Sequence, residues 1–433
     1  MFKLKNIFVK VKFDAMLSIG IISIGDELLI GQTINTNASW MGELLAKHGY
    51  KVKQVLTISD NEHEILHSLK VMTEQHDLVL ITGGLGPTKD DITKQVLCDF
   101  FETELILNEE VLKHVEQFFS KRNRPMLDVN RMQAMVPKSC KVLFNDEGTA
   151  PGMLFQHHDK IVVSMPGVPY EMKFLMQERV LSFLKERFNA SELCQHTYLT
   201  QGIGESFLAE KLKEWENELR GKGLDLAYLP SPGMVKLRIT SAKGRFADVE
   251  RFGSKLIEMI PSYLYGEEDE ALASIVGELL IHEKQTIGTV ESCTGGAVAS
   301  EITRIPGASA YFCGSLLTYT NTLKVKLAKV DAITLEKHGA VSMETVKEMA
   351  IGAKEVLGVD WMIAISGIAG PLGGTEEKPV GLVWVAIAGP DGVFAYNFQF
   401  GDNRERNIQM TVLSSLNLLR CRIKRIKIEK KQH

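Results

Sequence analysis

Hydrophobic and polar positions follow two different periods along the chain. Short apolar runs such as MLSIGIISIG (16–25) and DLVLITGG (77–84) predict buried strands. Between them, NASWMGELLAKHG (37–49) and NEHEILHSLKVMTEQ (61–75) repeat apolar residues at helical spacing. Strands that alternate with helices predict a mostly parallel sheet with helices on both faces. We therefore expect an α/β domain over residues 16–172.

The pattern changes twice further along the chain. A helical run at 172–188 and a hairpin-like segment, LAYLPSPGMVKLRITSAKG (226–244), with Pro and Gly at its bend, predict a small α+β module. The acidic YGEEDEA (265–271) indicates a boundary, after which strands and helices alternate again. The expected fold is two three-layer α/β domains with mostly parallel sheets, joined by the small module. The predicted segments are an N-terminal extension (1–15), the first domain (16–172), the module (173–268), the second domain (269–420) and a solvated basic tail (421–433).

Composition narrows the classes of protein that fit this pattern. The chain has 433 residues, which suits two or three domains, and its net charge of −4 gives no reason to expect a nucleic-acid partner. Its six cysteines form no CxxC pair, so we expect a reducing, cytoplasmic setting rather than a zinc ribbon or a disulfide framework. No apolar run approaches the roughly 18 residues of a membrane span, so no membrane partner is expected.

One metal motif is present and is rejected. HEILH places His63 and His67 at the i and i+4 spacing of a zinc protease helix. At about 100° per residue, Ile65, Leu69 and Met72 share one face, so the two histidines point to the opposite, solvent side. No third ligand follows downstream, and we expect an exposed helix.

A first candidate site lies in DLVLITGGLGPTKDDIT (77–93), which predicts a strand, a glycine turn and a helix. Glycines allow close approach of the backbone, and the unpaired N–H groups of a helix start attract phosphate. Asp90 and Asp91 follow at once, and paired carboxylates beside a phosphate suit a Mg²⁺-type ion. A sharp structural turn is the other interpretation. The glycines of the turn are Gly83, Gly84 and Gly86.

A second stretch brings more polar groups to the same edge. In IGDELLIGQTINTNASW, Asp26 and Glu27 end the first strand, and Asn35 and Asn37 open the next helix. Ligands of open α/β sheets bind at the carboxyl ends of the strands. We therefore expect two acidic pairs and the glycine loop to converge on one rim.

The second candidate site offers three nucleophiles, Ser292, Cys293 and Thr294, in the segment TVESCTGGAVAS. A strand ends there and a helix begins, so the N–H groups around Gly295 and Gly296 are expected to stabilise an oxyanion. Cysteine has the better thiolate chemistry, but no histidine stands near it in a recognisable motif, which favours a buried structural role. Serine is the weaker nucleophile and needs a base.

A lysine downstream supplies a candidate base. TYTNTLKVKLAKV predicts a helix capped near Asn321 or Thr322, with Lys324 in its first turn. The positive helix end is expected to lower the pKa of this lysine, which can then act as general base for Ser292. Tyr319 lies just before the helix, close enough to orient substrate or share the proton.

A third element is the glycine-rich loop of AISGIAGPLGGTEEKPVGLVWVAIA (364–388). One predicted strand ends in this loop and another follows it. Such a loop suits wrapping a phosphorylated or ring-bearing ligand, and a structural turn is the alternative. The residues that we expect to contact a ligand here are Gly367, Ala369 and Gly370.

Four N-terminal motifs carry a family resemblance. SIGDELLIGQTINTN, ITGGLGPTKDDIT, GTAPGM and MPGVPYEM resemble the N-terminal domain of the CinA (competence- and damage-inducible protein A) family, which is similar to molybdopterin-binding proteins of the MoaB and MogA type. The resemblance implies ADP-ribose pyrophosphatase activity with a divalent metal (Mg, Mn or Co), or pterin-nucleotide binding. It makes Asp26, Asp90 and Asp91 metal candidates and assigns the glycine loop, Thr88 and Asn37 to substrate. The middle segment resembles a KH-like module, without implying RNA binding.

The C-terminal motifs ESCTGG, TYTNTLK, HGAVSMETV, ISGIAGP and EEKPVG, within residues 271–418, closely resemble the CinA C-terminal domain. The resemblance implies an amidohydrolase that converts nicotinamide mononucleotide (NMN) to nicotinate mononucleotide and ammonia without a cofactor. It implies Ser292 as nucleophile and Lys324 as base, with Tyr319 in support. One departure is Leu372, where many members have Asp. The substrate-binding residues carried over are Thr294, Gly295, Gly296, Asn321, Gly367, Ala369, Gly370 and Arg404.

Two functions of different classes follow from the resemblance. The first is a bifunctional hydrolase of NMN and ADP-ribose, expected to be a homodimer. The second is a competence-associated binding or adaptor protein whose N-terminal pocket holds a pterin or nucleotide without turnover. The pairing of Ser292 with Lys324 favours the hydrolase, because a binding pocket needs no activated serine.

Overall fold

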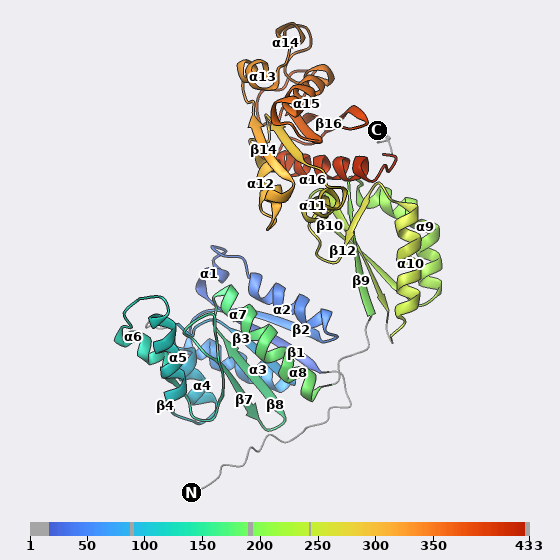
Figure 1. Ribbon diagram of the computed structural model, residues 1–433. Coiled ribbons are helices and arrows are strands. Elements are labelled where there is room, and N and C mark those ends of the chain that lie inside the picture. Colours follow the sequence, from blue (N-terminus) through green and yellow to red (C-terminus); the bar gives the residue numbers. More distant parts are fainter. Residues whose placement is uncertain (1–16, 87–90, 189–193, 242–243, 429–433) are drawn as a thin grey trace. The chain divides into compact units, whose positions relative to one another are not determined.

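The computed structural model describes residues 17–86, 91–188, 194–241 and 244–428. The chain divides into two compact units, residues 1–193 and 194–433. Both units are built from α/β layers, as predicted, and Figure 1 shows their sheets flanked by helices. None of the described helices is both long and apolar enough to cross a membrane.

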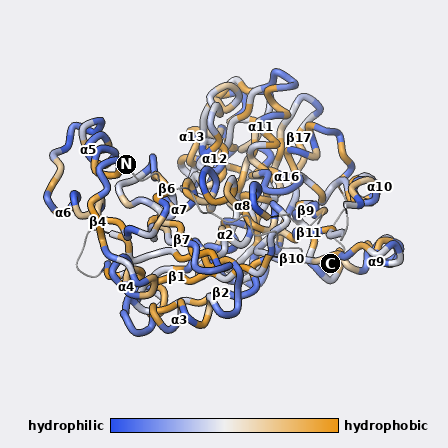
Figure 2. Tube along the Cα trace, turned by 90° about the horizontal axis from the view of Figure 1, so that it is seen from below, coloured by the Kyte–Doolittle hydropathy of each residue, from blue (hydrophilic) through white to orange (hydrophobic). Residues whose placement is uncertain are grey.

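A six-stranded sheet forms the centre of the first unit. The strand order is β2-β1-β3-β8-β7-β6, in which the first four strands run parallel, β7 is antiparallel to β8, and β6 is antiparallel to β7. Strands β1 and β3 are buried on both faces because helices cover both faces of the sheet. In Figure 2, the orange of hydrophobic residues runs along β1 and β7. The strands are β1 Ser18–Ile24, β2 Lys51–Ile58, β3 Leu78–Thr82, β6 Lys141–Leu143, β7 Gly152–His157 and β8 Lys160–Met165, with a separate ribbon of β4 Leu105–Leu107 and β5 Met135–Pro137.

Helices cover both faces of this sheet, as the alternating pattern predicted. Met41 of α2 packs on one face, and Ile65 of α3 packs on the other. His63 and His67 are exposed on α3, so the HEILH segment faces solvent, as predicted. The helices before residue 135 are α1 Asp26–Leu29, α2 Thr36–Lys47, α3 Glu62–Gln75, α4 Thr93–Phe100, α5 Glu109–Ser120 and α6 Asp128–Arg131, followed by a 3-10 turn at Met132–Ala134.

The helical run near residue 173 belongs to the first unit, which differs from the predicted boundary. Leu175 and Met176 are fully buried in the core that α2 also joins, and Figure 1 shows α7 and α8 along the same sheet. We expected the middle module to begin at residue 173. An amphipathic pattern shows which helix face is buried but not which sheet covers it, so the sequence left this helix unassigned. The run comprises α7 Pro169–Leu175, a π-helical turn Met176–Val180 and α8 Leu181–Arg187.

The middle module is a four-stranded antiparallel sheet with two helices. Its chain order β9-α9-β10-β11-α10-β12 and strand order β10-β11-β9-β12 form two interleaved β-α-β units, an arrangement called ferredoxin-like. Pro232 and Gly233 form the predicted hairpin bend, with Gly233 at φ 82°. Trp215 of α9 and Phe252 of α10 are buried in its core. The elements are β9 Cys194–Gln201, α9 Glu205–Gly221, β10 Asp225–Ser231, β11 Met234–Ser241, α10 Phe246–Met259 and β12 Leu264–Glu267.

A five-stranded sheet, β14-β13-β15-β16-β17, forms the rest of the second unit. Its first three strands are parallel. Strand β16 is antiparallel to β15, and β17 is antiparallel to β16, because loops rather than crossover helices lead into both. Helices α11, α12 and α16 cover one face, and α13 and α15 cover the other. The strands are β13 Ile287–Glu291, β14 Phe312–Leu317, β15 Trp361–Gly367, β16 Leu382–Gly389 and β17 Gly392–Gln399. The helices are α11 Leu272–Glu283, α12 Ala297–Thr303, a 3-10 turn Ala308–Ala310, α13 Asn321–Ala328, α14 Ala332–His338, α15 Met343–Leu357 and α16 Arg404–Ile423.

The last described residues are only partly the solvated tail that the sequence predicted. Helix α16 continues to Ile423, and Cys421 is buried. Arg420 is 2% exposed and donates to the carbonyl oxygens of Pro261 and Ser262 in the middle module. The end of α16 therefore joins the module to the C-terminal domain within the second unit.

Candidate functional site

The carboxyl ends of three parallel strands bring together the loops that the sequence singled out. Strand β13 ends at Glu291, β14 at Leu317 and β15 at Gly367. Glu291 pairs with Leu317, and Val290 pairs with Ala364 on the other side of β13. The nucleophile turn, the lysine helix and the glycine-rich loop therefore begin at one edge of the sheet, where ligands of open α/β sheets bind.

Ser292 and Lys324 meet at this edge. Lys324 Nζ lies 3.0 Å from Ser292 Oγ and donates to the carbonyl oxygen of Thr318 at 2.8 Å. The Thr320 side chain caps α13 by accepting from the Leu323 N–H, just before the cap that was predicted near Asn321 or Thr322. Lys324 lies in the first turn, as predicted. The serine and the lysine are 8% and 1% exposed, so their contact is shielded from water.

The pKa of Lys324 is lowered, in the predicted direction. The largest cause is burial of the ammonium, which the sequence analysis did not invoke. A lysine that gives up its proton more readily is present as the neutral amine at lower pH. That amine lies within hydrogen-bonding distance of Ser292 Oγ and can accept its proton, which is what a general base must do.

Cys293 lies in surroundings that disfavour a thiolate. Its side chain is buried in the core shared by α11, α12 and α16. Burial raises the pKa of the thiol to about 12, whereas reactive cysteines have lowered pKa values in electropositive, partly exposed sites. The geometry supports the structural role predicted for Cys293 and leaves Ser292 as the candidate nucleophile.

Glu291 occupies the helix start behind Ser292, a role that the sequence prediction missed. Its carboxylate is fully buried and accepts from the N–H groups of Gly296, Val298 and Ala299 at 2.9–3.1 Å. The Thr294 hydroxyl also donates to it, at 2.7 Å. These donors, which we expected to face a substrate, are therefore used within the protein. An acidic residue just before a run of small residues was the available signal.

The N–H groups that remain for an oxyanion lie in the turn before the helix. Within the described residues, the backbone N–H groups of Cys293 and Thr294 donate to no other backbone group. Gly295 and Gly296 have φ of 63° and 96°, and a Cβ built on either would meet no atom within 4 Å. Open space therefore borders this turn, and the candidate anion site moves from the helix to residues 293 and 294.

Glu291→Ala is expected to destabilise the second unit by about 3 kcal/mol, because four hydrogen-bond donors at the helix start lose their acceptor. The measurement is urea unfolding of the full chain, followed by hydrogen exchange of peptides over residues 287–303. Glu283→Ala, an exposed residue at the end of α11, is the control and should change little. Equal stability of the two variants would contradict the capping role of Glu291.

Tyr319 and Asn321 lie at this edge, and among the described residues neither forms a hydrogen bond with the serine or the lysine. Tyr319 is 59% exposed, and within the described part of the chain no hydrogen bond joins it to Ser292 or Lys324. Asn321 is exposed as the first residue of α13, whose cap is the preceding threonine. The supporting role of Tyr319 and the substrate contact of Asn321 stay predictions.

The glycine-rich loop is held against the start of α16. Arg404 donates to the carbonyl oxygen of Gly370 at 2.9 Å, and Asn407 donates to that of Ala369 at 3.0 Å. Burial raises the pKa of the Cys293 thiol, and the charge of Arg404 acts in the opposite direction, so this guanidinium lies within electrostatic range of the nucleophile turn. Asn407 is 1% exposed and was missed, because a polar residue inside a helix gives no sign of its partner.

The first unit has a cavity of about 370 Å³ at the carboxyl edge of its sheet. The glycines of the predicted turn line it, and a Cβ built on Gly84 would lie 2.0 Å from Thr93 Oγ1, so only glycine fits there. Gly83 lies at φ 117° and donates to the carbonyl oxygen of Met165 at 3.1 Å. The polar side chains that line the cavity are Glu27, Asp60, Asp91, Gln133, Thr149 and Glu171.

Carboxylates around this cavity are the donors that a divalent cation prefers. Glu27, Asp60 and Asp91 line it, whereas Asp26 is exposed at the start of α1. The pKa of Asp60 is raised by burial and also by the nearby charges of Asp26, Glu27 and Asp91, so these four groups share one rim. Among the described residues, no three His, Cys, Asp or Glu side chains are grouped tightly enough to hold a metal without rearrangement. Asp60 lies two residues after β2 and was missed.

Of the other residues predicted for this rim, the structure describes Asn37 but not Thr88 or Asp90. Asn37 donates to the carbonyl oxygen of Gly167 at 2.7 Å and to Thr82 Oγ1 at 3.2 Å, so its amide ties α2 to the neighbouring loops. Thr88 and Asp90 lie outside the described residues.

Three family models together match nearly the whole chain. The model of the CinA C-terminal domain matches residues 269–423, that of the probable molybdopterin binding domain matches 20–186, and that of the damage-inducible protein CinA KH domain matches 195–267.

Related proteins match along most of their length. A CinA-like protein of Cytophaga hutchinsonii is 43% identical over 411 residues, which are 94% of this chain and 98% of that protein. A putative competence-damage inducible protein of Caldicellulosiruptor bescii is 38% identical over 411 residues, 93% of this chain and 98% of that protein. A crystal structure of the protein CinA from Thermoplasma acidophilum, titled as of unknown function, is 33% identical, covers 40% of this chain and 97% of that chain, and has a TM-score of 0.35. The chain therefore belongs to the CinA family.

Proposed function

We propose that the C-terminal domain hydrolyses the carboxamide of NMN to nicotinate mononucleotide and ammonia. The observation that carries this proposal is the 3.0 Å contact between Ser292 Oγ and the buried Lys324 Nζ. A serine beside a lysine that is easily deprotonated is an activated nucleophile, and acyl transfer from an amide is the chemistry that such a pair performs.

The proposed reaction consists of acylation of Ser292 and hydrolysis of the resulting ester, and Lys324 carries the proton in both steps. Ser292 Oγ attacks the carboxamide carbon while the neutral Lys324 amine accepts the hydroxyl proton, and the N–H groups of Cys293 and Thr294 stabilise the oxyanion. The lysine then returns the proton to the departing nitrogen, ammonia leaves and an ester to Ser292 remains. Water attacks this ester, again giving its proton to the lysine, and the nicotinate product leaves as the serine regains its proton.

Ammonia release from NMN tests this proposal directly. The purified full chain is mixed with NMN, and ammonia and nicotinate mononucleotide are measured together. Both products should form in equal amounts, because one carboxamide is cleaved in each turnover. Absence of both at high enzyme concentration would refute the proposed amidase.

A second activity is proposed for the first unit, the hydrolysis of ADP-ribose to AMP and ribose 5-phosphate. The supporting observation is the cavity lined by Glu27, Asp60 and Asp91 beside the glycine turn. These carboxylates repel a pyrophosphate by themselves and would hold a divalent cation, which supplies charge neutralisation and a Lewis acid when bound. The turn of Gly83 and Gly84 lets the backbone approach the phosphates closely.

Metal removal is expected to abolish the ADP-ribose activity and leave the NMN activity unchanged. The reason is that the carboxylate cavity lies in one unit and the serine–lysine pair in the other. The full chain is treated with EDTA, dialysed and assayed on both substrates before and after addition of Mg²⁺, Mn²⁺ or Co²⁺. Binding of ADP-ribose without turnover under all three metals would instead favour the binding or adaptor role.

A further inference from the structure

A second loop lies at the carboxyl end of β15, in addition to the glycine-rich loop. It comprises His338, the last residue of α14, and residues 339–342 before α15. The Ser366 hydroxyl, on a residue that is 1% exposed, donates to the carbonyl oxygen of Ala340 at 2.6 Å. Ser366 lies on β15, two residues after the last position that pairs with β13. The 338–342 loop is therefore attached near the carboxyl end of the strand beside β13.

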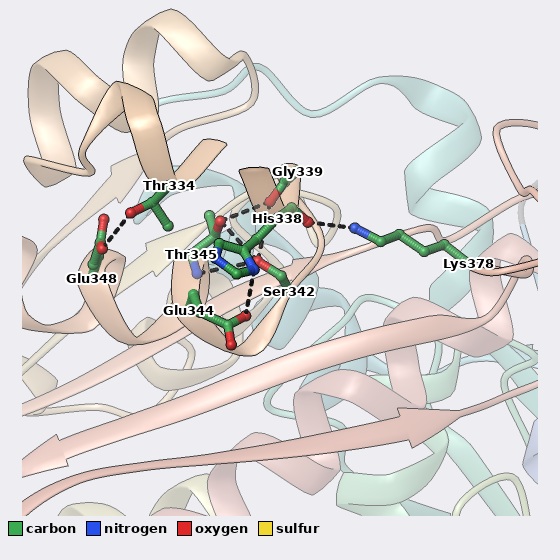
Figure 3. A network of polar contacts seen from close by, with 8 residues as sticks. All are labelled: Thr334, His338, Gly339, Ser342, Glu344, Thr345, Glu348 and Lys378. Atoms are coloured by element: carbon green, nitrogen blue, oxygen red, sulfur yellow. Dashed lines mark hydrogen bonds and ion pairs between the residues drawn. The ribbon is translucent and has the colours of Figure 1, made fainter. Parts of the chain in front are cut away.

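A network of polar contacts holds this loop in one conformation (Figure 3). The Thr345 hydroxyl donates to the carbonyl oxygen of Gly339 at 2.7 Å, and Ser342 Oγ lies 3.1 Å from the same oxygen. Ser342 Oγ also caps α15 by accepting from the Thr345 N–H at 3.2 Å. The His338 ring lies 3.7 Å from the Glu344 carboxylate. These contacts between the loop and the first turn of α15 hold the 338–342 loop against that helix.

The side chain of Lys378 connects the glycine-rich loop to the 338–342 loop. Lys378 Nζ donates to the carbonyl oxygen of His338 at 2.5 Å, as Figure 3 shows. A local turn presents this lysine, since the Thr375 N–H donates to Lys378 O at 2.9 Å. A Cβ built on Gly339 would lie 3.0 Å from the ammonium, so glycine leaves the room that the contact needs. Within the described residues no carboxylate forms an ion pair with Lys378, and its ammonium donates to this carbonyl.

We propose that Lys378 is a positioning residue that straps the glycine-rich loop to the fixed 338–342 loop and thereby sets the affinity of the amidase site for its substrate. The proposal rests on the amidase function proposed above. The apex of the strapped loop, residues 371–377, is exposed and contains two glycines, so without a strap it samples many conformations. Each binding event would then have to order the loop, and that cost appears as weaker binding.

The kinetic test compares Lys378→Met, which keeps the aliphatic stem, with Lys378→Arg, which keeps a charged donor. Lys378→Met should raise KM for NMN about tenfold and leave kcat within about twofold, since a charged hydrogen bond is lost but the Ser292–Lys324 pair is untouched. Lys378→Arg should restore most of the affinity. Lys337→Met, an exposed lysine near the end of α14, is the matched control and should behave as wild type.

Nicotinamide riboside, which lacks the phosphate, separates a strap from a direct phosphate contact. It is measured as a substrate or as a competitive inhibitor of NMN hydrolysis. A strap weakens the binding of both compounds by the same factor, because the loop is disordered for both. A loss confined to NMN would overturn the proposal, because it would make Lys378 a phosphate ligand. An unchanged KM for both compounds would overturn it as well.

Hydrogen exchange gives a readout that does not depend on activity. In Lys378→Met, peptides over residues 367–381 and 337–342 should exchange faster than in wild type, while peptides of the first unit should not change. Unchanged exchange in both loops would overturn the strap even if KM rises. If the wild-type chain releases no ammonia from NMN, the amidase fails, whereas faster exchange in the variant would still support the strap.

Discussion

Ser292→Ala is expected to lower the rate of ammonia release from NMN by at least about 10³-fold, because the substitution removes the proposed nucleophile and nothing nearby replaces it. The neighbouring thiol has a pKa raised to about 12 by burial and is packed in the core. KM should change little, since the serine hydroxyl contributes mainly to the transition state. The measurement is steady-state ammonia release over a range of NMN concentrations.

Cys293→Ala is the matched control for the nucleophile. It removes the thiol but keeps the backbone N–H at position 293, which is the part of this residue that the proposed mechanism uses. The variant should keep most of the wild-type rate. A loss in Cys293→Ala as large as in Ser292→Ala, with the fold retained, would transfer the chemistry to the sulfur and refute the serine mechanism.

Lys324→Met is expected to lower kcat for NMN by roughly 10²- to 10⁴-fold, the usual contribution of a general base. The same variant should be as stable as wild type or slightly more stable, because a buried amine that disfavours its own charge is replaced by an apolar side chain of similar length. Lys324→Arg should be nearly as inactive, since a guanidinium does not give up its proton. Activity and urea unfolding of the full chain are measured together. A variant that is both active and unstable would contradict this prediction.

The pH dependence of the NMN reaction should reflect the deprotonation of Lys324. Burial lowers the pKa of Lys324, so the fraction of neutral amine increases as pH rises through that lowered value. The rate should therefore rise with pH and level off below the pH at which an ordinary lysine loses its proton. Stability changes in the same direction: the unfolded chain binds this proton more tightly, so the folded state gains stability as pH rises between the two pKa values.

Local patterning predicted much of this protein. Alternating strand and helix periods predicted the α/β class of both domains, and Pro232 with Gly233 marked the hairpin of the middle module correctly. The strand-to-helix junction at Ser292 and the helix start before Lys324 were also predicted, because caps and glycine turns leave a signal within a few residues. Such features depend on neighbours in the chain, which a sequence displays.

Long-range packing decided the remaining features. Helix α7–α8 follows the first domain in sequence and looks like part of the next module, but its apolar side matches the first sheet. The N–H groups of α12 were expected to bind substrate and instead bind Glu291, because a carboxylate in the preceding strand reaches them. Neither result follows from periodicity, which shows that a face is buried without showing its partner.

The local pattern of the chain predicted the α/β class of both domains and named the serine and the lysine as candidates, because period, caps and turns depend on neighbouring residues. Packing in three dimensions established that Lys324 is buried beside Ser292, that Cys293 lies in the core and that Lys378 reaches the 338–342 loop. Burial and contact depend on residues far apart in sequence, and they set the pKa of a lysine and the choice between a hydroxyl and a thiol.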